Sequence, residues 1–187
     1  IGVSACLLGR NVRFDGGHKC SRFVTEALAG HFEFVAFCPE VAIGMGTPRQ
    51  PIRLVGDASD PQAVGVRTPE LNVSQPLQNY GKKVAGNIDT LCGFIFKKDS
   101  PSCGMERVKV RSEKGMPRKE GQGLFARELM RYNPTLPVAL QLLQASFFKD
   151  LSLIMAGVVA ATIPLVVLFI FAGRQLVAGI MQGAGKG

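Results

Sequence analysis

The sequence predicts an α/β fold: a Rossmann-like layered domain with a mainly parallel sheet, followed by a single hydrophobic helix of transmembrane type. Short apolar runs alternate with helix-like segments in the first part of the chain, as they do where crossover helices join parallel strands. Near residue 138 this charged part, punctuated by glycine and proline, gives way to a tail with almost no charge. We therefore expect a domain over residues 1–138 and a hydrophobic tail over residues 139–187.

Strands and helices of the domain are expected in alternation. Apolar runs bounded by turn residues indicate four strands, which we place in chain order at residues 1–6, 32–38, 64–67 and 92–97. Helix-like segments indicate two helices, one at residues 22–29 and one within 68–91 after Pro76. Residues 46–67 are otherwise polar and rich in proline.

The composition favours one core and does not point to a nucleic-acid partner. A chain of 187 residues with 47% hydrophobic content can bury one sizeable core. The net charge of +8 is carried by basic residues that are scattered along the chain and are not interleaved with aromatic residues. Only residues 106–114 form a charged stripe, and their alternation is typical of an edge strand with a solvated face. No nucleic acid is therefore expected as a partner.

The chain has five cysteines, an odd number, and no apparent secretory leader precedes them. A disulfide framework is therefore not expected, and we place the domain in a reducing compartment, the cytoplasm. Cys92 stands at the start of an expected strand and is interpreted as a core residue, and Cys20 as a surface-loop thiol. His18 and His31 lack the spacing of metal ligands.

The other three cysteines occupy similar positions relative to the expected strands. Cys6 ends the first strand, Cys38 ends the second, and Cys103 lies a few residues past the strand at 92–97. The carboxyl ends of parallel strands meet at one edge of a sheet, so three thiols can converge on one metal centre. Single cysteines are common in cores, but three at similar loop starts favour a site. Three thiolates suit zinc or an iron-sulfur cluster, and the lack of close Cys-x-x-Cys pairs favours the cluster.

Four motifs, in order along residues 1–138, together resemble the thiouracil desulfurase family. They are Ser-Ala-Cys-Leu-Leu-Gly at 4–9 with Val-Arg-Phe-Asp-Gly at 12–16, Cys-Pro-Glu at 38–40 with Gly-Met-Gly-Thr-Pro-Arg at 44–49, Ser-Pro-Ser-Cys-Gly at 100–104, and Gly-Leu-Phe-Ala-Arg at 123–127. The resemblance implies that Cys6, Cys38 and Cys103 hold a 4Fe-4S cluster. It also implies that the open iron takes sulfur from a small thiolated pyrimidine such as thiouracil, converting C=S to C=O without net redox change.

The same resemblance implies that Glu40 and Ser100 are the catalytic pair. Replacing C=S by C=O requires attack of water and movement of protons, for which a carboxylate close to a cluster ligand is suited. Ser100 is suited to orient the substrate or the water. Without the motifs, Glu40 reads as a helix-start carboxylate and Ser100 as a turn residue before proline. Asp15 and Arg49 are weaker candidates, the first as a turn former and the second as a brace for the cluster loop.

The tail has a separate interpretation. Residues 151–173 contain no ionisable side chain and are long enough to cross a membrane as a helix, which Pro164 would kink. From about 137 to 187 the sequence resembles the C-terminal end of carbohydrate ABC-transporter permeases, which indicates a fusion, a frameshift or an assembly join. If the tail is genuine, we expect it to anchor the chain at the inner membrane.

Two alternative functions stay open at this stage. Three thiolates can also stabilise loops in a metal-binding structural or sensing module without catalysis. The chain can also be a fragment of a membrane permease, although a single helix provides no transport pathway.

Overall fold

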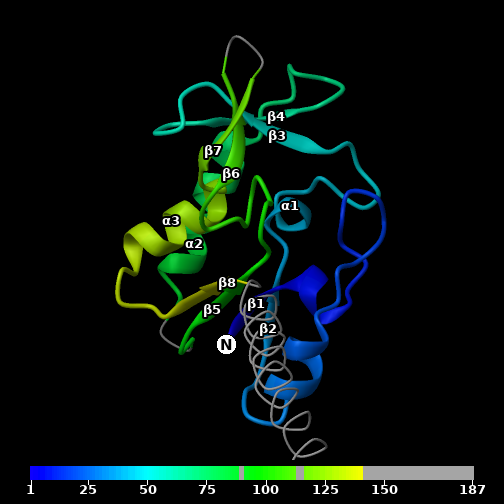
Figure 1. Ribbon diagram of the computed structural model, residues 1–187, viewed down its shortest axis with the longest axis vertical. Coiled ribbons are helices and arrows are strands. Elements are labelled where there is room, and N and C mark those ends of the chain that lie inside the picture. Colours follow the sequence, from blue (N-terminus) through cyan, green and yellow to red (C-terminus); the bar gives the residue numbers. More distant parts are fainter. Residues whose placement is uncertain (89–90, 113–115, 141–187) are drawn as a thin grey trace, which may run out of the picture. The chain divides into compact units, whose positions relative to one another are not determined.

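The computed structural model describes three stretches of the chain (Figure 1), residues 1–88, 91–112 and 116–140. Apart from its first two residues, the predicted tail over 139–187 lies outside them, and so does its helix at about 151–173. Within the described part of the chain, no helix is long and apolar enough to cross a membrane. The described domain combines helices with two four-stranded sheets, which we call sheet A and sheet B.

Sheet A is entirely parallel. Its strands, in spatial order, are β2 (Val35–Phe37), β1 (Gly2–Ser4), β5 (Phe94–Phe96) and β8 (Val138–Leu140). The central strands β1 and β5 are buried along their whole length, as expected for a parallel sheet that is covered on both faces. β1, β2 and β5 lie within runs that the sequence predicts to be strands. β8 extends two residues past the predicted domain boundary at 138.

Sheet B is mixed, so the prediction of one mainly parallel sheet is correct only for sheet A. Its strands, in spatial order, are β4 (Gln62–Gly65), β3 (Ile52–Val55), β6 (Val108–Arg111) and β7 (Pro117–Gly121). β3 is antiparallel to β4 and parallel to β6, and β6 is antiparallel to β7. The β3–β4 hairpin lies in the Pro-rich stretch at 46–67, where the sequence predicts only one short strand.

The charged stripe at 106–114 includes β6, whose side chains alternate as predicted. Val108 and Val110 are buried, whereas Lys109 and Arg111 are exposed. β6 is nevertheless an interior strand between β3 and β7, because the chain returns alongside it as a hairpin. The prediction of an edge strand is therefore wrong, and that of a solvated charged face is confirmed.

Within the described residues, five helical segments complete the fold: the 3-10 turn η1 (Ala5–Leu8), the π-helix η2 (Phe23–Leu28), α1 (Pro39–Ala42), α2 (Ser74–Ala85) and α3 (Leu124–Tyr132). η2 matches the helix predicted at 22–29. α2 begins at Ser74 and not after Pro76, because a proline in the first turn of a helix has no intrahelical N–H bond to lose. It ends at Ala85, before the predicted limit at 91.

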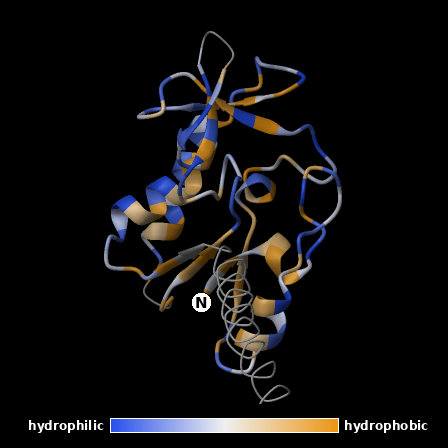
Figure 2. Cartoon of the chain, in the orientation of Figure 1, coloured by the Kyte–Doolittle hydropathy of each residue, from blue (hydrophilic) through white to orange (hydrophobic). Residues whose placement is uncertain are grey.

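Helices cover both faces of sheet A. α2 and α3 pack against each other and cover one face through an aromatic cluster that includes Phe94, Phe96 and Phe125. They also contribute Leu77 and Leu124 to the hydrophobic cluster of sheet B. η1 and η2 pack on the cluster at the other face of sheet A. Figure 2 shows hydrophobic residues concentrated along the strands of this sheet. Because helices cover both faces of sheet A, a site on this sheet must be built from the loops at the ends of its strands.

Candidate functional site

Loops that follow three neighbouring strands form the wall of one cavity. β1 lies between β2 and β5 and runs parallel to both, so the three strands end at the same edge of sheet A. Cys6 follows β1, Cys38 follows β2, and Cys103 follows β5 through a longer loop. All three cysteines line a cavity of about 380 Å³, together with Glu40 and Ser100. The structure thus brings together the five residues that the sequence indicates for the site.

The first two cysteine loops are tight turns. Cys6 lies in η1, which Gly9 ends with a φ of 83°, a conformation that residues with a side chain rarely adopt. Cys38 is the N-cap residue of α1, whose first position is Pro39. The Cys38 thiol also donates a hydrogen bond to the Val12 carbonyl oxygen at 3.7 Å. Backbone geometry therefore holds both cysteines at the cavity wall.

The third cysteine loop, residues 100–104, is held by the start of α3. The first N–H groups of an α-helix have no partners within the helix. In α3, the backbone N–H of Leu124 donates to the Pro101 carbonyl oxygen. The N–H groups of Phe125 and Ala126 both donate to the Ser102 carbonyl oxygen. The motif that opens α3 therefore has a structural role, because it holds the loop that carries Cys103.

Burial raises the pKa of all three thiols and so disfavours their charged form. It raises the pKa of Cys103 to about 12, although hydrogen bonds with Ser4 and Ser102 oppose the shift. Burial likewise raises the pKa values of Cys6 and Cys38, against the opposing effect of the Lys97 ammonium on Cys6. A cationic partner would favour the three thiolates, and its binding would release protons.

The donor set fits an iron-sulfur cluster better than a single zinc ion. Cys6, Cys38 and Cys103 come from three separate loops around the cavity. Among the described residues, no three or more histidine, cysteine and acidic side chains are arranged to hold a metal ion. A cluster is larger than an ion and takes one thiolate at each of several irons, so its ligands lie farther apart. Soft sulfur donors in this arrangement suit such a group.

Gly123, directly before α3, lies against the loop that carries Cys103. A Cβ atom at Gly123 would lie 2.5 Å from the Ser102 carbonyl carbon and 2.7 Å from the Gly104 nitrogen, closer than Cβ atoms approach in proteins. Both neighbours are backbone atoms, so Gly123→Ala is expected to displace the loop and to lower the iron content of purified protein severalfold. Gly30→Ala is the matched control, since no atom lies within 4 Å of a Cβ there. Equal iron contents, measured after anaerobic purification, would contradict this prediction.

Glu40 is held at both of its carboxylate oxygens. Oε2 lies 2.8 Å from both Nε and Nη2 of Arg49, and Oε1 accepts a hydrogen bond of 2.7 Å from Ser102 Oγ. The side chains of Glu40 and Arg49 are only 12% and 5% exposed, so water screens this ion pair weakly. Arg49 also donates to the carbonyl oxygens of Val12 and Gly46. Arg49 thus braces the surrounding loops, as the sequence indicates, and in addition fixes Glu40.

Replacing Arg49 by methionine is expected to lower the free energy of unfolding by about 3 kcal/mol, because a mostly buried carboxylate loses its counter-charge. Arg13→Met is the matched control. Arg13 pairs with the exposed Asp15 at 3.2 Å, and exposed pairs contribute little to stability. Urea unfolding, followed by circular dichroism, compares the two variants. If both variants lost the same free energy of unfolding, burial of the Glu40–Arg49 pair would not explain how much the pair stabilises the fold.

Ser102 is a site residue that the sequence analysis missed. It is 1% exposed, and its Oγ lies 3.0 Å from Ser100 Oγ, so it connects Ser100 with Glu40. Ser100 Oγ also accepts hydrogen bonds from the backbone N–H groups of Ser102 and Cys103, which gives it the turn role that the sequence allows. The signal for Ser102 is its place in the Ser-Pro-Ser-Cys motif. Its contact with Glu40, 62 residues away, becomes visible only in the fold.

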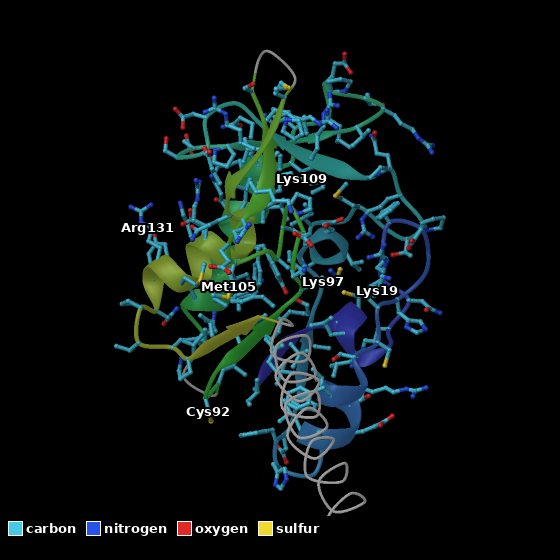
Figure 3. All side chains as sticks on the ribbon, in the orientation of Figure 1. Lys19, Cys92, Lys97, Met105, Lys109 and Arg131 are labelled. Atoms are coloured by element: carbon cyan, nitrogen blue, oxygen red, sulfur yellow. The ribbon has the colours of Figure 1, made fainter. Side chains whose placement is uncertain are left out.

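The remaining candidates have structural roles or lie elsewhere. Asp15 accepts a hydrogen bond from a following backbone N–H and forms a turn, as predicted. Cys20 is exposed, as predicted for a surface thiol. Cys92 is also exposed, so its prediction as a core residue is wrong: β5 begins only two residues later. Figure 3 shows Cys92 and Lys97 at opposite ends of β5. Both histidines are exposed.

Comparison with known proteins gives three findings. The family model of 2-thiouracil desulfurase matches residues 1–141. Among solved structures, the chain is similar to the 4Fe-4S-dependent thiouracil desulfidase TudS, with a TM-score of 0.61 and 30% identity, over 82% of this chain and 97% of that one. Among curated proteins, it is similar to the uncharacterized protein YbbK of Bacillus subtilis (strain 168), with 29% identity over 113 residues, which are 54% of this chain and 71% of the relative. The family match contains all four motifs and every cavity residue named above.

Proposed function

The chain belongs to the 2-thiouracil desulfurase family, as its motifs indicate, and we propose on this basis that it removes sulfur from a thiolated pyrimidine such as 2-thiouracil. The family and the structural neighbour are desulfurase and desulfidase enzymes. The observation that carries the proposal for this chain is the position of three cysteines and Glu40 around a single cavity.

The proposed reaction replaces the sulfur atom of C=S by oxygen from water. A new C–O bond forms at the ring carbon, the C–S bond breaks, and sulfur leaves as hydrosulfide with release of a proton. No electron is gained or lost overall, so the reaction needs neither an oxidant nor a reductant. It needs a partner for the sulfur and a group that moves protons.

Cys6, Cys38 and Cys103 are proposed to hold a 4Fe-4S cluster. When bound through three thiolates, such a cluster supplies an open iron that acts as a Lewis acid toward sulfur. The three loops that carry these cysteines support the assignment, because each provides one cysteine to the lining of the same cavity. Burial also disfavours the charged form of these thiols, and a cationic cluster iron would offset that cost.

Glu40 is proposed to move the protons. Arg49 fixes one of its oxygens and Ser102 the other, so the carboxylate keeps one orientation at the cavity wall. In this position a carboxylate can accept a proton from the attacking water and pass it on as the C–S bond breaks. Ser100, connected to Glu40 through the Ser102 hydroxyl, is proposed to orient the water or the substrate.

A direct assay tests the proposal. Anaerobically purified protein with its iron retained is incubated with 2-thiouracil, and uracil and sulfide are measured over time. We expect both products in equal amounts, and none from protein treated with an iron chelator. Iron-loaded protein that converts neither 2-thiouracil nor other thiolated pyrimidines would contradict the proposal.

A further inference from the structure

The cavity contains a basic residue to which the proposed function gives no role. Lys97 directly follows β5, and its half-buried side chain lines the cavity together with the three cysteines. Its backbone N–H donates to Ser4 Oγ at 3.0 Å, which ties it to the end of β1. Figure 3 shows it in the middle of the domain, at the end of β5 where the strands of sheet A lead into the cavity loops. Lys97 thus belongs to the cavity wall, and its charge acts on the Cys6 thiol.

The other basic side chains of the cavity wall already have acidic partners. Arg49 pairs with Glu40, Arg13 with Asp15, and Lys98 with Asp99. Lys97 Nζ donates one hydrogen bond of 2.6 Å, to the Lys98 carbonyl oxygen. In the stretches that the structure describes, no carboxylate lies within ion-pair distance of Lys97 Nζ. An ammonium group has three N–H donors, so two remain available to a ligand.

The surroundings of Lys97 favour an anion. Burial lowers the pKa of Lys97, and the charges of the Cys6 sulfur and the Asp99 carboxylate oppose this shift, although Asp99 lies outside ion-pair distance. A partly desolvated ammonium is stabilised by any negative charge that comes close to it. The proposed reaction produces such a charge inside this cavity, since the sulfur leaves as hydrosulfide. The departing sulfur and the ammonium would share the space bounded by the cysteine loops.

We propose that Lys97 is the anion-binding residue of the cavity and holds the hydrosulfide that is released when the C=S bond is hydrolysed. This inference rests on the proposed function. Lys97 donates a hydrogen bond to the sulfur anion and takes no part in bond breaking, so its proton stays on Nζ. The proton produced together with hydrosulfide leaves by way of Glu40 or water.

Product inhibition tests this assignment. Iron-loaded full-length protein converts 2-thiouracil in the presence of increasing sodium hydrosulfide, and the inhibition constant of hydrosulfide is measured. Lys97→Met is expected to raise this constant about tenfold, which corresponds to about 1.4 kcal/mol, because a charged hydrogen bond is lost. Lys97→Arg, which keeps the charge, should stay close to the unmodified protein. Lys109→Met is the matched control, since Lys109 is an exposed residue of β6 on sheet B and does not line the cavity.

A second readout is independent of turnover. Hydrosulfide is titrated into the same proteins without 2-thiouracil, and binding is followed by the visible spectrum of the cluster. The same order of affinities is expected, with Lys97→Met the weakest. If Lys97→Met loses its iron, Lys97→Gln replaces it in both experiments.

Two negative results have different meanings. If the unmodified protein converts 2-thiouracil but binds hydrosulfide no more tightly than the Lys97→Met protein does, only the role of Lys97 is overturned. Iron-loaded protein that converts no thiolated pyrimidine overturns the proposed function, and the inference with it.

Discussion

Replacing Cys103 by alanine is expected to remove the iron-sulfur cluster and, with it, all desulfuration. Cys103 is the most buried of the three cavity cysteines, and its loop is tied to α3 by several backbone hydrogen bonds. No other described cysteine lines the cavity besides Cys6 and Cys38, so no thiol can take its place. Alanine adds no polar group to the buried position, so the fold should tolerate the change. Iron analysis and the visible spectrum after anaerobic purification measure the loss.

Cys92→Ala is the matched control for this prediction. Cys92 is exposed and lies at the opposite end of β5 from the cavity. Its replacement should leave the iron content, the visible spectrum and the rate of uracil formation unchanged. A Cys103→Ala protein that keeps its full iron content and colour would show that this cysteine is not a ligand.

Replacing Glu40 by glutamine is expected to reduce turnover about a thousandfold, within the range that positioned acid-base groups contribute. Glutamine keeps the shape of the side chain and one oxygen, but it can no longer take up the proton of the attacking water. The side chain is not a proposed ligand, so the iron content should stay unchanged. The rate of uracil formation and the iron content are measured on the same samples.

Glu120→Gln is the matched control, because Glu120 is an exposed residue of β7 on sheet B. Its turnover should equal that of the unmodified protein. Glu40→Gln also separates the enzyme from a structural or sensing module, in which three thiolates hold metal without catalysis. A Glu40→Gln protein with full activity would remove Glu40 from the mechanism. Iron-loaded protein that shows no desulfuration with either residue at position 40 would favour the module.

The convergence of the cysteines could be predicted because strand ends are visible in the sequence. Cys6 and Cys38 each stand at the end of an apolar run, and parallel strands place their carboxyl ends at one edge. The prediction needed only the direction of the strands and their presence in one sheet. Sheet A meets both conditions, with β1 between β2 and β5.

The contacts of Glu40 could not be read from the sequence. Arg49 lies nine residues away, across a turn with a cis peptide bond between Thr47 and Pro48. Ser102 lies 62 residues away and reaches Glu40 only because the loops after β2 and β5 meet at the cavity. Neither residue has a periodic or compositional signal that indicates its partner. Such pairs depend on the tertiary arrangement of loops.

Sheet B was predicted only in part, as a short strand at 64–67 and an edge strand within 106–114, for a related reason. Residues 52–55 alternate between buried and half-buried positions, but they stand in a stretch whose prolines and polar residues indicate loop. The parallel pairing of β3 with β6 joins segments more than 50 residues apart. Both strands pack against α2 and α3 in one hydrophobic cluster, which favours this pairing. The same long-range pairing places β6 in the interior of the sheet.

Anaerobic analysis of iron, acid-labile sulfide and zinc in the purified protein, together with its visible spectrum, tests the central claim most directly. A cluster held by Cys6, Cys38 and Cys103 predicts a brown protein with about four iron and about four sulfide per chain and no zinc. Zinc alone, or a folded but colourless protein after anaerobic reconstitution with iron and sulfide, would contradict it.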